Sequence, residues 1–109
     1  MGGVTQFHET GKQFDILTLD VFKDDLNSLG VFDVVTCCGV LYEANEQELI
    51  RILKLLKPRG RLLCCHIDCD TFYPVHDMLC HLLGSPDVDL QFPYRNMTEH
   101  LTLHTVTMS

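Results

Sequence analysis

The stretch from Phe32 to Leu63, FDVVTCCGVLYEANEQELIRILKLLKPRGRLL, decides the fold of this chain. Its apolar pattern predicts a buried strand over 33–38, a turn at Gly39, an amphipathic helix from about Glu46 to Leu56, and a second strand over 61–67. Two apolar strands joined by a helix pair in parallel, with the helix crossing one face of the sheet. The stretch therefore predicts a β-α-β unit.

The two ends of the predicted helix carry recognisable signals. Asn45 is a suitable N-cap, and Glu48 three residues later completes a capping box. The run Lys57-Pro58-Arg59-Gly60 is expected to end the helix before the second strand begins.

Ligands of parallel sheets bind beyond the carboxyl ends of the strands. Here the residues that follow the two strands are Cys38, Gly39, Tyr42 and Glu43 after the first, and Asp68 and Asp70 after the second. We expect ligand contacts at this edge, with Tyr42 and Glu43 as candidates to face a substrate. The alternative is that these residues only form the turn and the approach to the helix.

The residue pattern of this stretch resembles that of a known family. FDVV followed by a small-residue turn, GVL, a helix and LLKPRGRLL is similar to the second half of class I S-adenosylmethionine-dependent methyltransferases. The upstream segment FDILTLDVFKDDL fits the same pattern, and the resemblance covers roughly residues 14–83. It implies that Asp20, Val21 and Phe22 flank the adenine of the cofactor, and that Cys38 and Gly39 border the same ligand.

Two features of the family are missing from the sequence. No apolar strand is followed by a G-x-G-x-G loop, and no acidic residue stands where the family holds the cofactor ribose. The sequence therefore resembles a methyltransferase domain that starts partway through the fold of the family.

The remaining segments complete the predicted fold. Residues 1–13 lack periodicity and are expected to form a flexible N-terminal segment, and 14–109 a partial methyltransferase-like domain. The pattern predicts further elements, namely a strand over 14–20, a helix over 71–83, and two strands over 88–93 and 100–108. The expected fold class is α/β, with a Rossmann-like, mainly parallel sheet, covering helices and an antiparallel C-terminal hairpin.

Composition narrows the classes of partner. The chain has 109 residues and a net charge of −7, which argues against direct binding to nucleic acid or to an anionic membrane. No apolar stretch approaches the ~20 residues that span a bilayer, and the N-terminus has no signal-peptide core. We therefore expect a cytoplasmic protein.

The six cysteines are expected to be reduced thiols. Cys37, Cys38, Cys64 and Cys65 fall inside apolar strands, where cysteine behaves as a small hydrophobe. A zinc site from Cys65, Cys69, His76 and His81 has permissible spacing, and Cys69 beside His66 or His76 would be a nucleophile with its base. Neither is favoured, so no metal and no catalytic residue is predicted.

Two functions remain from the sequence. The resemblance implies methyl transfer from S-adenosylmethionine to an unknown acceptor, by a partial domain that is inactive alone. The alternative is a non-catalytic methyltransferase-like module that binds a protein partner or associates with itself through open sheet edges.

Overall fold

The computed structural model describes residues 4–9 and 12–106. Its elements, in chain order, are β1 (Val4–Glu9), β2 (Lys12–Leu17), the short 3₁₀ helix η1 (Asn27–Leu29), β3 (Phe32–Cys38), α1 (Glu46–Leu53), β4 (Leu56–Ile67), α2 (Tyr73–Leu83), β5 (Val88–Tyr94) and β6 (Met97–Thr105). The chain is α/β, as the sequence predicts.

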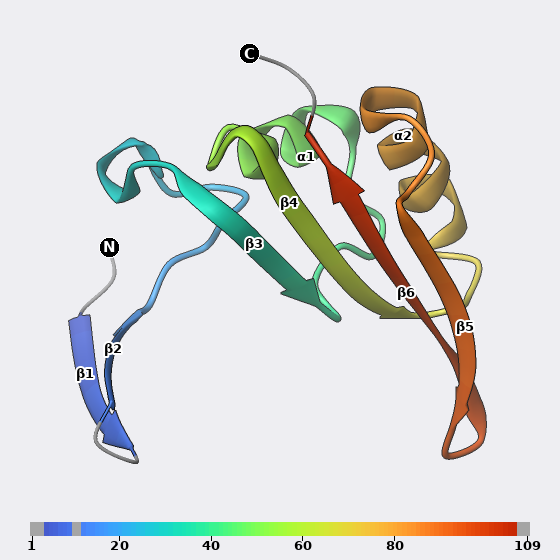
Figure 1. Cartoon of the computed structure of the whole chain (residues 1–109), viewed down its shortest axis with the longest axis horizontal. Helices are drawn as coiled ribbons and strands as arrows, with labels where there is room; N and C mark the ends of the chain where they lie inside the picture. The colour runs from blue at the N-terminus through green and yellow to red at the C-terminus, as the bar shows by residue number, and fades with distance from the viewer. Residues whose placement is uncertain (1–3, 10–11, 107–109) are drawn as a thin grey trace.

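The main sheet has four strands in the order β3-β4-β6-β5 (Figure 1). β3 pairs with β4 in parallel, through partners such as Cys37 with Cys64, which confirms the predicted pairing. β6 pairs antiparallel with both β4 and β5. The expectation of a mainly parallel sheet is therefore wrong, because only the β3–β4 pair among the described strands is parallel. A tight β5–β6 hairpin forces an antiparallel pair, and its second strand returns beside β4.

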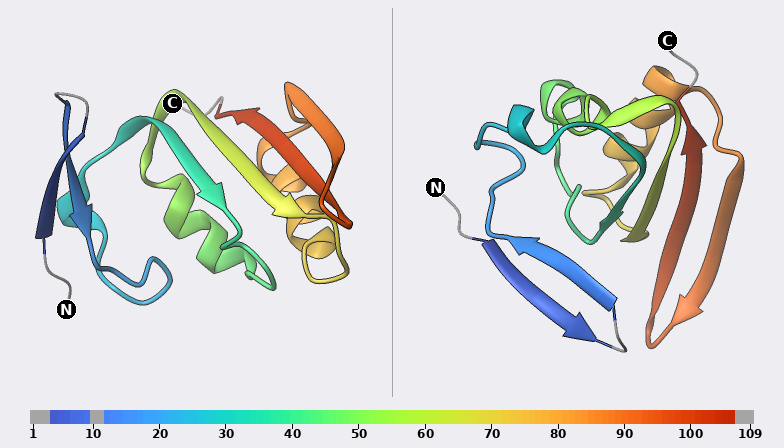
Figure 2. Two further views of the ribbon diagram at one scale, coloured as in Figure 1. Left: turned by 90° about the horizontal axis from the view of Figure 1, so that it is seen from below. Right: turned by 60° about the vertical axis from the view of Figure 1, so that its left-hand side comes forward.

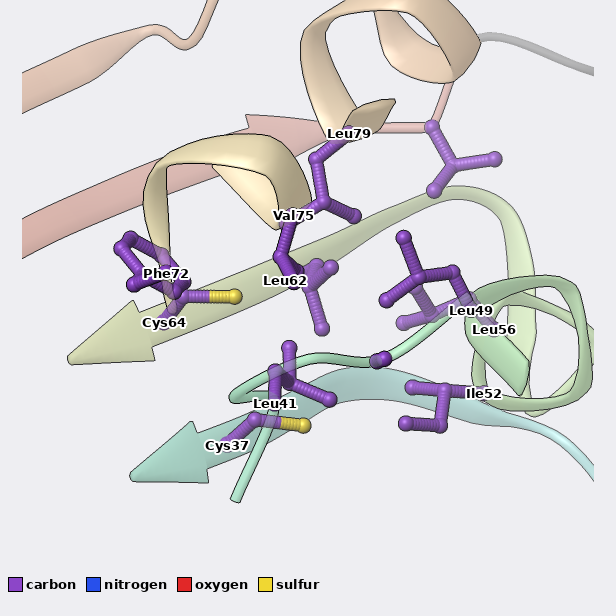
Figure 3. Close-up of a cluster of buried hydrophobic side chains, with 12 residues drawn as sticks. Cys37, Leu41, Leu49, Ile52, Leu56, Leu62, Cys64, Phe72, Val75 and Leu79 are labelled. Atoms are coloured by element: carbon purple, nitrogen blue, oxygen red, sulfur yellow. The ribbon is translucent and has the colours of Figure 1, made fainter. Parts of the chain in front are cut away.

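Both helices lie on the same face of the sheet (Figure 2). The core forms between this face and the helices, with Leu62 and Cys64 of β4 beneath Leu49 and Ile52 of α1 and the α2 residues Val75 and Leu79 (Figure 3). Side chains of a strand alternate between faces, so the neighbours of these core residues project to the uncovered side. On that side Val34 is 54% exposed, and Leu90, Phe92 and Tyr94 are also exposed.

The N-terminal part of the chain differs from the prediction. Residues 4–9, expected to be an irregular flexible segment, form β1, and the strand expected over 14–20 is β2, ending at Leu17. β2 pairs antiparallel with β1 and forms a separate two-stranded sheet, not a further parallel strand beside β3. Without a neighbouring parallel strand, the backbone groups of β2 are satisfied by the nearest extended segment in the sequence.

The junction between α1 and β4 is tighter than predicted. α1 ends at Leu53, not at Leu56, and β4 already begins at Leu56. Backbone hydrogen bonds explain the early start of β4. Phe32 N–H of β3 donates to the carbonyl of Leu55, and Arg59 N–H donates to the carbonyl of Val106, next to the end of β6. The Lys-Pro-Arg-Gly run thus forms an irregular start of the strand, with Arg59 at a φ of 66°.

The N-terminus of α1 has the predicted capping box. The Asn45 side chain accepts from Glu48 N–H at 2.8 Å, and the Glu48 carboxylate accepts from Asn45 N–H at 3.0 Å. The helix α2 also agrees with the prediction, with Pro74 in its first turn and Gly84, at a φ of 84°, after its last residue. Among the helices of the described residues, none has the length and apolarity needed to cross a bilayer.

Replacing the cap of α1 is expected to weaken the fold. Asn45→Ala removes the acceptor for Glu48 N–H, so the free energy of unfolding should fall by about 1 kcal/mol. Urea denaturation followed by circular dichroism measures the change. Gln47→Ala, on an exposed position of the same helix turn, is the control and should leave stability almost unchanged. Equal losses in the two variants would contradict a role for the cap.

Candidate functional site

The candidate site lies at the carboxyl end of the parallel β3–β4 pair. Two loops meet there, residues 39–45 after β3 and residues 68–72 after β4. Gly39 N–H donates to the carbonyl of Cys65 at 3.0 Å, and Glu43 N–H donates to the carbonyl of Thr71 at 3.0 Å. These bonds hold the two loops side by side, so the residues predicted for the ligand edge share one end of the sheet.

His66 of β4 fixes the first of these loops. Its Nε2 accepts from Leu41 N–H at 3.0 Å and from Val40 N–H at 3.3 Å. The side chain is 1% exposed, and burial lowers its pKa to about 4. A neutral ring whose Nε2 accepts carries its proton on Nδ1. His66 is thus a neutral acceptor that holds the loop backbone, a role that the sequence analysis did not assign.

Tyr42 also fixes the loop that follows β3. Its hydroxyl oxygen accepts from Ile67 N–H at 2.6 Å, and its ring meets the rings of His66 and Phe72 edge-on. The residue is half-buried, and these contacts give it a structural role at the sheet edge. Glu43 is exposed, with a φ of 60°. Of the two residues predicted to contact a substrate, Glu43 is therefore the one that is open to solvent.

The loop after β4 contributes acidic residues to this edge of the sheet. Asp68 N–H donates to the carbonyl of Thr98 at 2.8 Å, which ties this loop to β6. A hydrogen bond to Asp68 is the main reason that the pKa of Tyr73 is raised. Asp70 is exposed beside them. The edge therefore carries negative charge next to the Tyr73 hydroxyl of α2.

Asp20 lies in a turn after β2. Its Oδ1 accepts from Phe22 N–H at 2.9 Å, and its own N–H donates to Asp24 at 2.8 Å. The turn is anchored to α1, because the Arg51 guanidinium donates to the carbonyls of Val21 and Asp24. Phe22 packs against the core, while the Asp20 side chain is exposed. The predicted adenine contacts thus form an ordered turn beside the first helix.

Cys38 and Gly39 end β3. Both are exposed, and Gly39 has a φ of 69°, a conformation that suits glycine. The adjacent core cysteines are different, since burial raises the pKa of Cys37 to about 11 and that of Cys64 to about 12. All six cysteines are free thiols. The buried pair acts as packing, as the sequence predicts, and Cys38 is the thiol of β3 that is open to solvent.

The five residues predicted to bind the cofactor line neither of the two cavities described below. One cavity of about 360 Å³ lies between the η1 region and α1 and is lined by Leu26, Arg51 and Leu55, among others. A second, of about 440 Å³, is apolar and lies between the C-terminal ends of the two helices, next to Leu53, Leu82 and Val106. Neither includes Asp20, Val21, Phe22, Cys38 or Gly39.

The cysteine and histidine combinations weighed from the sequence are not assembled. Cys65 contacts Glu99 through a 3.6 Å Sγ–Oε2 pair, and Cys69 contacts the Thr71 hydroxyl. His81 is exposed on α2. Instead, the structure brings His76 together with Asp89 and His100, which come from three different elements. No spacing rule connects these positions, so the sequence analysis missed them.

Comparison with known proteins adds no family. A scan against models of protein families finds no match, and a search of curated proteins finds no significant relative. The resemblance to methyltransferases therefore stays a prediction from the motifs in the sequence.

Proposed function

We propose that the chain is a partial S-adenosylmethionine-dependent methyltransferase domain that contributes one half of a cofactor site and transfers a methyl group to an acceptor not identified by the sequence. The observation that carries the proposal is the parallel β3-α1-β4 unit, followed by α2 and an antiparallel finishing hairpin. This is the order of elements that the motif resemblance implies for the Rossmann-like second half of the family.

The positions of the motifs support the same assignment. FDVV forms the start of β3, and its carboxyl end is the exposed Cys38–Gly39 turn. The LLKPRGRLL run forms most of β4, whose partner in the parallel pair is β3. The location of both motifs on the paired parallel strands supports the proposal, because ligands of parallel sheets bind beyond the carboxyl ends of such strands.

The Asp20 turn would supply the adenine contacts of the proposed site. An exposed carboxylate beside apolar Val21 and Phe22 can accept from the adenine amine, and Arg51 holds the turn in place. The upstream strand that carries the turn is part of a separate hairpin, however, and no G-x-G-x-G loop is present for the ribose and the methionine carboxylate. Each charge-assisted hydrogen bond that is lost costs ~1.5–3 kcal/mol, so affinity falls by powers of ten.

The proposal predicts weak but localised cofactor binding. Titration of S-adenosylmethionine into the ¹⁵N-labelled chain should give a dissociation constant weaker than about 1 mM, a range that corresponds to only ~4 kcal/mol of binding free energy. The amide shifts should concentrate at residues 20–22 and 38–40. Heteronuclear NMR is suited to the measurement because it reports weak binding residue by residue.

A matched pair of variants makes the test specific. Asp20→Ala should abolish the shifts at both segments, whereas Asp25→Ala, in the same acidic loop, should retain them. Shifts that are absent at millimolar cofactor, or that spread over unrelated surfaces, would contradict the proposal. Micromolar binding by this chain would instead show that the cofactor site is complete by residues outside the five named above.

The alternative is a non-catalytic module that binds a protein partner. It is favoured by the uncovered sheet face, on which Val34, Leu90, Phe92 and Tyr94 are exposed. It is also favoured by β3 and β5, which are the edge strands of the described sheet. The same titration separates the two functions, because a module of this kind gives no cofactor-induced shifts.

A further inference from the structure

Two histidines and an aspartate, all residue types that bind metals, lie together between α2 and the β5–β6 hairpin, and Phe72 lies between them and His66 of the candidate site. His76 comes from α2, Asp89 from β5 and His100 from β6. One ligand atom of each lies within 4.8 Å of those of the other two. The ring centroids of His76 and His100 are 4.7 Å apart, and His100 Nε2 is 2.5 Å from Asp89 Oδ1. The three elements thus direct two imidazoles and a carboxylate to one point.

The histidines at this point have unused nitrogen atoms. His100 is 3% exposed, and its Nδ1 finds no hydrogen-bond partner among the described residues. Nδ1 of His76 and both ring nitrogens of the fully buried His104 also have no hydrogen-bond partner among the described residues. Buried polar groups in proteins are nearly always paired, and each exception needs a cause. Within the group itself, the unpaired atoms are Nδ1 of His76 and Nδ1 of His100, and imidazole nitrogens without a partner are available as metal ligands.

The surroundings suit a cation bound by neutral imidazoles. Burial is the main cause that lowers the pKa of His104 on β6, so this buried ring favours its neutral form and adds no positive charge that would oppose a cation. Asp89 supplies the negative charge, and it lies on an edge strand with its side chain partly open to solvent. An ion can therefore enter from the β5 edge without opening the core.

We propose that His76, Asp89 and His100 bind a divalent transition metal, for which zinc has the best-matched ligand chemistry. Zinc takes imidazole nitrogen and carboxylate oxygen at about 2.0–2.2 Å in tetrahedral geometry. Ligand atoms in such a site lie ~3.3–3.5 Å apart, so the His100–Asp89 pair opens slightly and His76 moves inward.

The fourth position of the site is adjacent to Cys80. Its Sγ lies 3.7 Å from Nε2 of His76, one helical turn earlier on α2. Cys80 is not among the three residues whose ligand atoms converge, so we assign the fourth position to water. Three protein ligands and water form an open metal site, the kind that polarises a bound molecule. The inference is independent of the proposed methyltransferase function.

The test is titration of Zn²⁺ into the metal-free, reduced chain, measured by calorimetry. One equivalent is expected, with affinity that falls on acidification because protons compete with the metal for its ligands. Asp89→Asn and His76→Gln should each weaken binding by more than about 100-fold, since each removes a direct ligand. His81→Gln and Asp77→Asn, exposed on the same helix, are the matched controls and should bind as the parent does.

Cobalt substitution separates this site from binding to the cysteines. Co²⁺ bound to nitrogen and oxygen shows weak visible bands, whereas thiolate ligands add intense near-ultraviolet charge transfer. The proposal requires the first spectrum. Absence of stoichiometric binding, thiolate coordination, or unchanged affinity in both ligand variants would overturn it. Circular dichroism of the metal-free variants shows whether each is folded, and the partly exposed Asp89 is the position least expected to disturb folding.

Discussion

Phe72→Ala should lower the free energy of unfolding by about 3–5 kcal/mol, which is a large share of the stability of a domain of this size. Phe72 is 0% exposed and lies at the start of α2 (Figure 3). Its ring stacks on His66 with centroids 4.4 Å apart and planes 5° from parallel, and it meets Tyr42 and His100 edge-on. Removing the ring leaves a cavity beside Tyr42 and His66 of the candidate site.

The neighbouring residue provides the control for this experiment. Tyr73 is 46% exposed, so Tyr73→Ala should cost little by comparison. Equilibrium denaturation in urea measures both variants. In addition, the amide signals of residues 39–45 should shift in Phe72→Ala only, because His66 loses the ring against which it stacks. Similar losses of stability in the two variants would contradict the place given to Phe72 in the core.

Acid should destabilise the fold between pH 6.5 and pH 4 through His66. Its pKa is about 4 in the folded chain against 6.5 for an unperturbed histidine, so in this window the unfolded chain binds the proton and the folded chain does not. Stability conferred by the neutral ring is therefore complete above pH 6.5 and is lost as the pH falls toward 4. The loss is at most about 3 kcal/mol. Burial lowers the pKa of His104 too, so it adds in the same direction.

Variants isolate the contribution of His66. The free energy of unfolding is measured across this pH window for the parent chain, for His66→Gln and for the exposed His81→Gln. Subtracting the curves removes the titration of the carboxyl groups, which is common to all three. His66→Gln should be less stable at pH 7 and should fall less on acidification, whereas His81→Gln should follow the parent. A parent curve without a decline over this range would exclude the proposed linkage.

The elements that the sequence predicted well are those with strong local patterns. The strand formed by FDVVTCC, the stripe of Leu49 and Ile52, and the Asn45–Glu48 box depend on contacts within a few residues, and all appear in the structure. The expectation that the strand is buried is wrong, because β3 lies at an edge of the sheet and Cys37 is its one buried residue. The end of α1 was misplaced because Leu53, Leu55 and Leu56 continue the helical pattern, while Leu55 and Leu56 are needed by β3 as strand partners. A tertiary hydrogen bond outweighed the local preference.

The direction of strand pairing was the larger error. Whether a strand is parallel depends on where its neighbour comes from in the chain, and the N-terminal strands had nothing in their composition to favour a hairpin with each other over a place beside β3. The group of His76, Asp89 and His100 was missed for a similar reason. His76, Asp89 and His100 are brought together by the packing of α2 on the β5–β6 hairpin, and no periodicity in the sequence records that contact.

The position of both helices on one face has a thermodynamic consequence. A sheet that keeps one apolar face in water exposes less new surface when it unfolds than a domain covered on both sides. The denaturant dependence of unfolding and its heat-capacity change both scale with that newly exposed surface. For this chain both quantities should be small for its length, and the stability curve correspondingly flat with temperature. A layer added to the face of Val34 and Leu90, whether from another protein or another segment, would steepen that curve by withdrawing the same surface from water.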